Sequence, residues 1–218
     1  MWYQAGGSRN KMAMKLDVPV IGILRGIEAS FFKEILHASF GAGLQAIEVT
    51  MNTENAAQII STCRASVPSG KLLGAGTVRN PDEAKKAADA GAMFFVTPNT
   101  DISVIEYALS RNIPVIAGAF TPTEVYNAWS AGADMVKVFP CGHFGPQYIK
   151  DLLGPFDNIA LVAVGGVTIS NVGDYFRAGV KAVGVSTSLF GKAALENRNI
   201  EDLAKNVKNF VEESAKQL

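Results

Sequence analysis

The sequence has few of the side chains that bind transition metals or form disulfides. Its 218 residues include two cysteines, Cys63 and Cys141, and two histidines, His37 and His143. The cysteines lack the paired spacing of a metal site, and a chain of this length needs no disulfide framework, so we expect a reducing, cytoplasmic setting. We interpret His37 as structural and Cys141 as a small buried residue, leave His143 unassigned, and predict no metal site.

Charge of one sign and long apolar runs are also missing. Twenty basic and twenty acidic residues give a formal net charge of zero, without a long run of either sign. The chain therefore offers no electrostatic footprint for nucleic acid, and small molecules are the expected partners. The N-terminus lacks the apolar stretch of a signal peptide, and no apolar run approaches the roughly 20 residues of a membrane helix, so we expect no membrane partner.

The sequence does contain a repeated alternation of two kinds of segment. Short apolar runs rich in β-branched residues alternate with helix-like segments, several of which end in glycine just before the next run. Pro81, Pro122 and Pro146 stand where first helical turns are expected. We predict eight strands, at residues 19–25, 46–50, 72–78, 94–98, 114–119, 135–140, 160–166 and 182–188.

Eight β/α units at this spacing predict an α/β fold, a single-domain (β/α)₈ TIM barrel that spans residues 1–218. Residues 1–17 are expected to add a helix across the bottom of the barrel, and residues 199–217 to form a closing helix. A doubly wound open sheet is the structural alternative, because periodicity alone does not close a sheet. In a barrel, the active site lies at the C-terminal ends of the strands.

Polar residues gather at those predicted strand ends, whereas the rest of each strand is apolar. In a barrel, the side chains at the C-terminal strand ends surround one pocket, which is where a substrate would bind. The residues at these ends are Arg25, Glu48, Thr50, Thr77, Pro98, Lys137, Phe139, Pro140, Gly165, Gly166, Ser186 and Thr187.

Lys137 is the central candidate, because the motif DMVKVFP places it between two valines in a buried strand. Burial lowers the pKa of an ammonium group, and a free amine attacks a carbonyl to form a Schiff base. A structural lysine paired with Glu48, or one that snorkels outward, would also explain the pattern. Glu48 is itself a charge in an apolar strand, and beside a Schiff-base lysine it would move protons during carbon–carbon bond cleavage.

Small and hydroxyl residues end the seventh and eighth predicted strands. Gly165 and Gly166 end the seventh, and the run from Ser186 to Ser188 ends the eighth. Barrels commonly build a phosphate site there from backbone amides and hydroxyls. A tight turn followed by an ordinary helix cap is the alternative interpretation.

Two further strand ends suggest contacts to an anionic substrate. Thr77 could donate a hydrogen bond to a carboxylate. Gly74 and Gly76 before it either allow close backbone approach or merely fit a crowded barrel interior. Arg25 faces the predicted mouth and can bind an anion, and the alternative is a surface arginine on a loop.

The motifs IEVT, GAGTV, VTPN, KVFP and GGV follow one another between Val20 and Ser188. With these motifs, the chain resembles the class I aldolases of 2-keto-3-deoxy-6-phosphogluconate (KDPG) and 4-hydroxy-2-oxoglutarate (KHG), together with the related 2-keto-3-deoxy-6-phosphogalactonate (KDPGal) aldolases. The resemblance implies a lyase without metal or cofactor, usually a homotrimer, that acts on a phosphorylated 2-keto-3-deoxy sugar acid and releases pyruvate.

The same resemblance implies a role for each candidate residue. Lys137 would form the imine with pyruvate, and Glu48 would be the general acid and base. Thr77 would contact the pyruvate carboxylate, with Pro98 and Phe139 as apolar walls against its methyl group. The phosphate would be held by Gly165, Gly166, Ser186 and Thr187.

Two departures from the family pattern bear on the substrate. Asn52 stands where many gluconate-type enzymes have an arginine, so carboxylate binding is expected to fall to Arg25. Val164 stands where they tend to have threonine, and loss of a hydroxyl partner can relax or invert the choice between epimers. The segments AVGGVT, ILRGI and FGPQYIK look more like the galactonate-type enzymes, whereas EVTMNT looks more like the gluconate type.

Our first hypothesis is an aldolase that reversibly splits KDPG into pyruvate and glyceraldehyde 3-phosphate. A further candidate substrate is KHG, which would yield pyruvate and glyoxylate. The alternative is KDPGal, the C4 epimer of KDPG. Outside the aldolases, the rival hypotheses are a phosphosugar isomerase or epimerase that works without an imine, and a non-catalytic sensor of phosphorylated keto acids.

Overall fold

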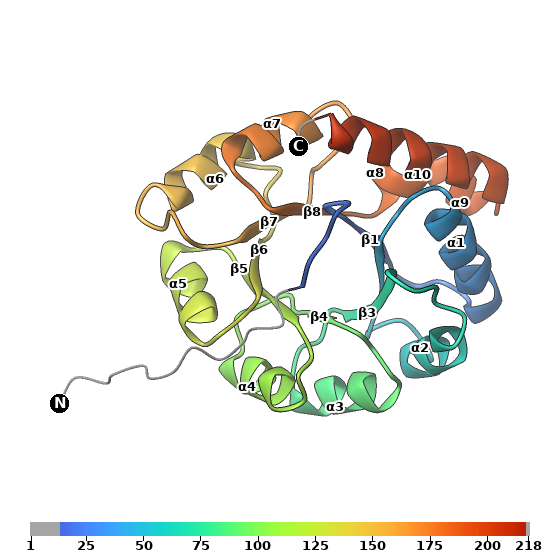
Figure 1. The fold of residues 1–218 in the computed structure, drawn as a ribbon, viewed down its shortest axis with the longest axis horizontal. Coiled ribbons are helices and arrows are strands. Elements are labelled where there is room, and N and C mark those ends of the chain that lie inside the picture. The colour runs from blue at the N-terminus through green and yellow to red at the C-terminus, as the bar shows by residue number, and fades with distance from the viewer. Residues whose placement is uncertain (1–13, 217–218) are drawn as a thin grey trace.

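The computed structural model describes residues 14–216, which contain eight parallel strands closed into one barrel (Figure 1). β8 pairs in parallel with β1, with Val20 opposite Val183, and this pairing closes the sheet. The predicted (β/α)₈ barrel is confirmed, and the open doubly wound sheet is excluded. The strands are β1 (Val20–Leu24), β2 (Ala46–Thr50), β3 (Leu72–Gly76), β4 (Phe95–Val96), β5 (Val115–Ala119), β6 (Met135–Val138), β7 (Leu161–Val164) and β8 (Ala182–Val185).

Helices form an outer ring around the strands (Figure 1). Their apolar faces pack against the outward-facing side chains of the strands in one large core cluster. The helices are α1 (Ala29–Gly41), α2 (Ala56–Arg64), α3 (Pro81–Asp89), α4 (Ile102–Ser110), α5 (Pro122–Ser130), α6 (Gly145–Leu153), α7 (Val172–Ala178), α8 (Thr187–Phe190), α9 (Lys192–Glu196) and α10 (Ile200–Ala215).

Local sequence signals explain where several helices begin. Pro81 and Pro122 are the first residues of α3 and α5, and Pro146 is the second residue of α6. Proline is suited to these positions, because its missing N–H would have no partner within the helix. At α5, Thr121 and Glu124 also form a reciprocal capping box.

All eight predicted strands exist, but most of them end before the predicted boundary. Thr77, Pro98, Phe139 and Ser186 therefore lie in loops that begin just beyond β3, β4, β6 and β8. Loops held by a rigid barrel are the usual place for binding residues. The early strand ends thus put these candidates at the mouth of the barrel.

The barrel interior contains two layers of different character. The lower layer is apolar, and Met14 and Leu16 pack against it. The segment that contains them crosses the opening of the barrel in Figure 1. Glu48 and Lys137 follow Ala46 and Met135 of this layer by two residues, so they lie on the same strand face and one level higher. The layer consists of Ile21, Ala46, Phe94, Val96, Ile116, Met135, Val162 and Ala182, and the same apolar cluster also includes Val164 at the C-terminal end of β7.

The two expected terminal helices have different outcomes. The N-terminal helix falls mainly on residues 1–13, outside the described residues, and residues 14–17 are not helical. The closing helix corresponds to α10, which packs against α1, α7 and α8. No helix among residues 14–216 combines the length and apolar character needed to cross a membrane.

Candidate active site

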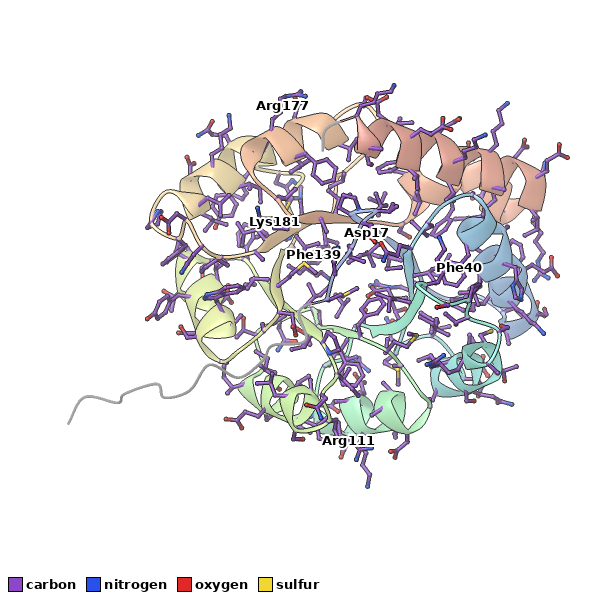
Figure 2. All side chains as sticks on the ribbon, viewed as in Figure 1. Asp17, Phe40, Arg111, Phe139, Arg177 and Lys181 are labelled. Atoms are coloured by element: carbon purple, nitrogen blue, oxygen red, sulfur yellow. The ribbon has the colours of Figure 1, made fainter. Side chains whose placement is uncertain are left out.

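A cavity of about 520 Å³ opens at the C-terminal ends of the strands. In Figure 2, Phe139 lies over the barrel interior, whereas Arg111 and Arg177 project from the outer helices. Every residue predicted for the site lines this cavity, namely Arg25, Glu48, Thr77, Pro98, Lys137, Phe139, Val164, Gly165, Gly166, Ser186 and Thr187. Of the other strand-end residues, Thr50 and Pro140 are not part of the lining.

Lys137 projects from β6 into the barrel and is 6% exposed. Burial lowers the pKa of its ammonium group, an effect that the charge of Glu48 opposes and that of Arg25 reinforces. Its Nζ lies 5.0 Å from the centroid of the Phe139 ring. The outward-snorkelling interpretation of this lysine is therefore wrong, and its amine faces the cavity.

Glu48 lies on β2, on the side of the barrel opposite β6, and is 1% exposed. Burial raises the pKa of its carboxyl group to about 7, although the charges of Lys137 and Arg25 act to lower it. Within the described part of the chain, Oε2 of Glu48 has no hydrogen-bond partner. A carboxyl group of this kind can both accept and donate a proton near neutral pH.

Two glycines of β3 make room for side chains of neighbouring strands. A Cβ atom at Gly76 would lie 2.2 Å from Oε1 of Glu48, and one at Gly74 would lie 2.4 Å from the Phe94 ring. Both distances are far below van der Waals contact. These distances support the crowded-interior interpretation of the two glycines, and at Gly76 the crowding comes from the candidate catalytic carboxylate.

Arg25 and Thr77 line the cavity from the ends of β1 and β3. Arg25 follows β1 and is exposed, and its charge acts on the pKa values of both Glu48 and Lys137. Thr77 follows β3, is half-buried, and has a φ of 52°. A positive φ is rare for a β-branched residue and costs about 1–3 kcal/mol, so the surrounding barrel holds Thr77 in an unusual conformation at the cavity.

The ends of β7 and β8 line the cavity with glycines and hydroxyl groups. Gly165 and Gly166 follow β7 with φ values of 86° and 83°, which a residue with a Cβ rarely adopts. Ser186 and Thr187 stand at the start of the four-residue helix α8. Beside them, Val164 is 6% exposed and presents only methyl groups to the cavity.

Four lining residues escaped the sequence analysis of individual sites. Ile23 precedes Arg25 by two residues on the same face of β1, so strand alternation would have predicted it. Gly184 packs its bare Cα against Val164, and a glycine carries no side-chain pattern to read. The four residues are Ile23, Val167, Gly184 and Val185, and Ser188 of the predicted hydroxyl run also lines the cavity.

The remaining candidate residues do not line the cavity. Cys141 is buried, its Sγ donates to the carbonyl oxygen of Val138, and burial raises its thiol pKa to about 11, as expected for an inert residue. His37 lies on α1 and His143 is exposed in the loop before α6, and neither lines the cavity. Among residues 14–216, no group of three or more His, Cys, Asp or Glu side chains is arranged to hold a metal ion.

The fold and the cavity together define an enzyme of the (β/α)₈-barrel class, with an amine and a carboxyl group in the pocket. The family model described as KDPG and KHG aldolase matches residues 10–206. The chain therefore belongs to the KDPG and KHG aldolase family and is a lyase. The resemblance suggested by its strand-end motifs is confirmed.

Individual relatives include enzymes for both epimers. The chain is 35% identical over 202 residues to the 2-dehydro-3-deoxy-6-phosphogalactonate aldolase of Escherichia coli, covering 92% of this chain and 98% of the relative. It is 32% identical over 181 residues to the 2-dehydro-3-deoxy-phosphogluconate aldolase of Pseudomonas aeruginosa, covering 82% of this chain and 80% of the relative.

Solved structures of aldolases also match this chain over most of its length. A structure described as native KDPGal matches with a TM-score of 0.88 and 33% identity, covering 94% of this chain and 98% of that chain. The KDPG aldolase of Legionella pneumophila, described with pyruvate captured at low pH as a covalent carbinolamine intermediate, matches with a TM-score of 0.81 and 25% identity, covering 88% of this chain and 93% of that chain.

Proposed function

We propose that this aldolase cleaves a 2-keto-3-deoxy-6-phospho sugar acid through a Schiff base on Lys137, without a metal ion. One observation carries the proposal: a buried amine and a buried carboxyl group share one cavity, and the environment moves each pKa toward neutrality. The carbinolamine described for the Legionella pneumophila relative supports it, because a carbinolamine is the adduct that loses water to form an imine.

The first half of the reaction builds an electron sink on the substrate. The unprotonated Nζ of Lys137 adds to the C2 carbonyl, and the carbinolamine loses water to leave a protonated imine. Burial of Lys137 favours the amine over the ammonium form and so supplies the nucleophile near neutral pH. The positive imine nitrogen can then accept the electron pair of the C3–C4 bond.

The second half of the reaction moves one proton out and one proton back. Glu48 accepts the proton of the C4 hydroxyl, directly or through a water molecule, as the C3–C4 bond breaks and the aldehyde leaves. The enamine carbon C3 then takes a proton from Glu48, and water hydrolyses the imine to pyruvate and the free amine. A carboxyl group whose pKa is raised to about 7 suits both directions of transfer.

The rest of the cavity can hold the two ends of the substrate. On the carboxylate side, we assign Arg25 and Thr77 to the anion, and Pro98 and Phe139 to the methyl group of the bound pyruvate. On the phosphate side, the backbone and hydroxyl groups of Gly165, Gly166, Ser186 and Thr187 are assigned to the 6-phosphate. The homotrimer implied by the resemblance and the cytoplasmic setting expected from the cysteine content stay predictions.

Between the two epimers, the galactonate substrate has at least as much support as the gluconate substrate of our first hypothesis. Val164 lines the cavity with methyl groups, so it cannot hydrogen-bond a substrate hydroxyl there. The galactonate-type relative also matches over more of both chains than the gluconate-type relative does. We therefore propose KDPGal as the preferred substrate and KDPG as the second candidate.

The test follows pyruvate release from each epimer with a coupled dehydrogenase assay, with and without EDTA. We expect a higher kcat/KM for KDPGal, and we expect Val164→Thr to move the ratio toward KDPG by about tenfold through its new hydroxyl partner. Val162→Thr, on the same strand face but below the cavity, is the matched control and should leave the ratio unchanged.

Three results would contradict parts of the proposal. A preference for KDPG that Val164→Thr does not alter would reject the epimer assignment. Activity that is lost in EDTA and restored by a divalent metal would reject the metal-independent mechanism. Absence of pyruvate release from either epimer, in a folded chain, would favour the sensor hypothesis.

A further inference from the structure

Thr53 is not part of the cavity lining, yet its hydroxyl group joins the loop that follows the Glu48 strand to the loop that carries Arg25. Its side chain is 5% exposed, and Oγ1 accepts a hydrogen bond from the backbone N–H of Gly26 at 2.9 Å. Gly26 directly follows Arg25. The bond therefore connects the loop after β2 to the backbone next to the arginine assigned to the substrate carboxylate.

The hydroxyl group of Thr53 is itself anchored to β2. It lies 3.0 Å from the hydroxyl group of Thr50, which is fully buried and ends the strand that carries Glu48. The backbone N–H of Thr53 also donates to the carbonyl oxygen of Thr50 at 2.9 Å. A continuous chain of hydrogen bonds thus runs from the Glu48 strand, through two threonines, to Gly26.

The bond replaces a strand contact at the point where β1 and β2 separate. Their parallel pairing ends with Leu24 opposite Val49, one residue before Arg25. Gly26 then has a φ of 62°, and a Cβ there would have no heavy atom within 4 Å. Ile27 packs against the core on one side of Gly26, and the hydrogen bond to Thr53 ties the backbone of Gly26 itself to the loop after β2.

The position of Arg25 matters because its charge acts at the reacting centre. It lowers the pKa of both Glu48 and Lys137. An arginine side chain is long and flexible, so the position of its guanidinium group depends on where its backbone is held. A loop that moved away from β2 would take the cation away from the substrate carboxylate and from the two catalytic groups.

We infer that Thr53 is a positioning residue that sets the place of Arg25 against the substrate carboxylate by holding Gly26 to the Glu48 strand. This inference rests on the proposed aldolase function, because it assigns Arg25 a part in binding the keto acid. Thr53 contacts no substrate in this account, and it acts through Arg25 alone.

The experiment is a double-mutant cycle with Thr53→Val, which keeps the shape but removes the acceptor, and Arg25→Met. KM and kcat for the preferred epimer are measured for the native chain, both single variants and the pair. We expect Thr53→Val to raise KM about tenfold with a smaller effect on kcat. In the Arg25→Met background, the same substitution should change KM by less than about twofold, because the group it positions is gone.

Two controls separate positioning from simple stability. Thr53→Ser retains the oxygen acceptor and should bring KM back to within about twofold of the native value. Thr121→Val removes the capping hydroxyl of α5, away from the cavity, and should lower Tm without raising KM.

The outcomes distinguish this inference from the proposed function. If the native chain releases pyruvate but Thr53→Val changes only Tm, or raises KM equally with and without Arg25, Thr53 is structural and the inference is overturned while the aldolase function stands. If the folded native chain releases no pyruvate from either epimer, the proposed function fails and the inference fails with it.

Discussion

On β2 and β6, a step of two residues separates apolar side chains from charged ones. Ala46 and Met135 belong to the apolar lower layer of the barrel, whereas Glu48 and Lys137 face the cavity above it. Both layers are buried, so burial alone does not distinguish them. The lower layer stabilises the barrel by excluding water, and the same exclusion raises the pKa of Glu48 and lowers that of Lys137.

Residues that stabilise the fold and residues that carry the reaction therefore alternate in level along a single strand. Substitutions in the upper layer should change turnover more than folding, and substitutions in the lower layer should do the reverse. In (β/α)₈ barrels, the C-terminal face commonly carries the catalytic residues, whereas the N-terminal face contributes to stability.

Lys137→Met should have the largest effect, because it removes the nucleophile and the electron sink together. We expect turnover to fall by about 10⁴-fold or more in steady-state assays, with an unchanged far-UV circular dichroism spectrum. Phe94→Leu in the lower layer is the contrasting variant. It should cost about 1–2 kcal/mol of unfolding free energy while turnover stays within a few fold. Near-native turnover in Lys137→Met would contradict the assignment of catalysis to the upper layer.

Glu48→Gln should have the second largest effect. Loss of the proton acceptor is expected to lower kcat by about 10²–10⁴-fold. In the native chain, kcat/KM should rise with pH through about 7 as Glu48 becomes a carboxylate. A pH–rate profile of Glu48→Gln that keeps this acid limb would assign it to another group.

The same carboxyl group links stability to pH. Because its folded pKa is raised from 4.5 to about 7, its contribution to the unfolding free energy is fully present below pH 4.5 and is lost as pH rises through 7. Denaturant titrations should show this decline in the native chain and a flatter profile in Glu48→Gln.

Gly76→Ala and Gly74→Ala make the smallest and sharpest comparison, because the two glycines are neighbours on one face of β3. The new methyl group at Gly76 would meet the carboxyl group of Glu48, and that at Gly74 would meet the Phe94 ring. We expect Gly76→Ala to lower kcat by about 10- to 100-fold and Gly74→Ala to cost about 1–3 kcal/mol of stability. Equal effects of both variants on kcat would remove the distinction between the layers.

The fold was predictable because each strand is a short apolar run bounded by turn residues and helix caps. The count of eight units predicted a closed barrel, but periodicity also allowed an open sheet, because closure depends on the pairing of β8 with β1 across almost the whole chain. The charged site residues were also predictable, because Lys137 and Glu48 interrupt apolar strands.

The sequence does not identify the partner atoms of residues that act through contacts between strands and loops. Gly76 matters because of where the Glu48 carboxyl group lies, and Thr53 matters because its hydroxyl group reaches Gly26. Neither distance can be read from spacing along the chain. Only the folded barrel brings these atoms together.

The most direct test of the central claim is intact mass after borohydride reduction, with and without pyruvate, on the native chain and on Lys137→Met, followed by peptide mapping. We predict a pyruvate-dependent adduct on the native chain, located at Lys137, and none on the variant. A folded native chain that forms no adduct, or an adduct at another lysine, would contradict the account and make Lys137 a structural charge.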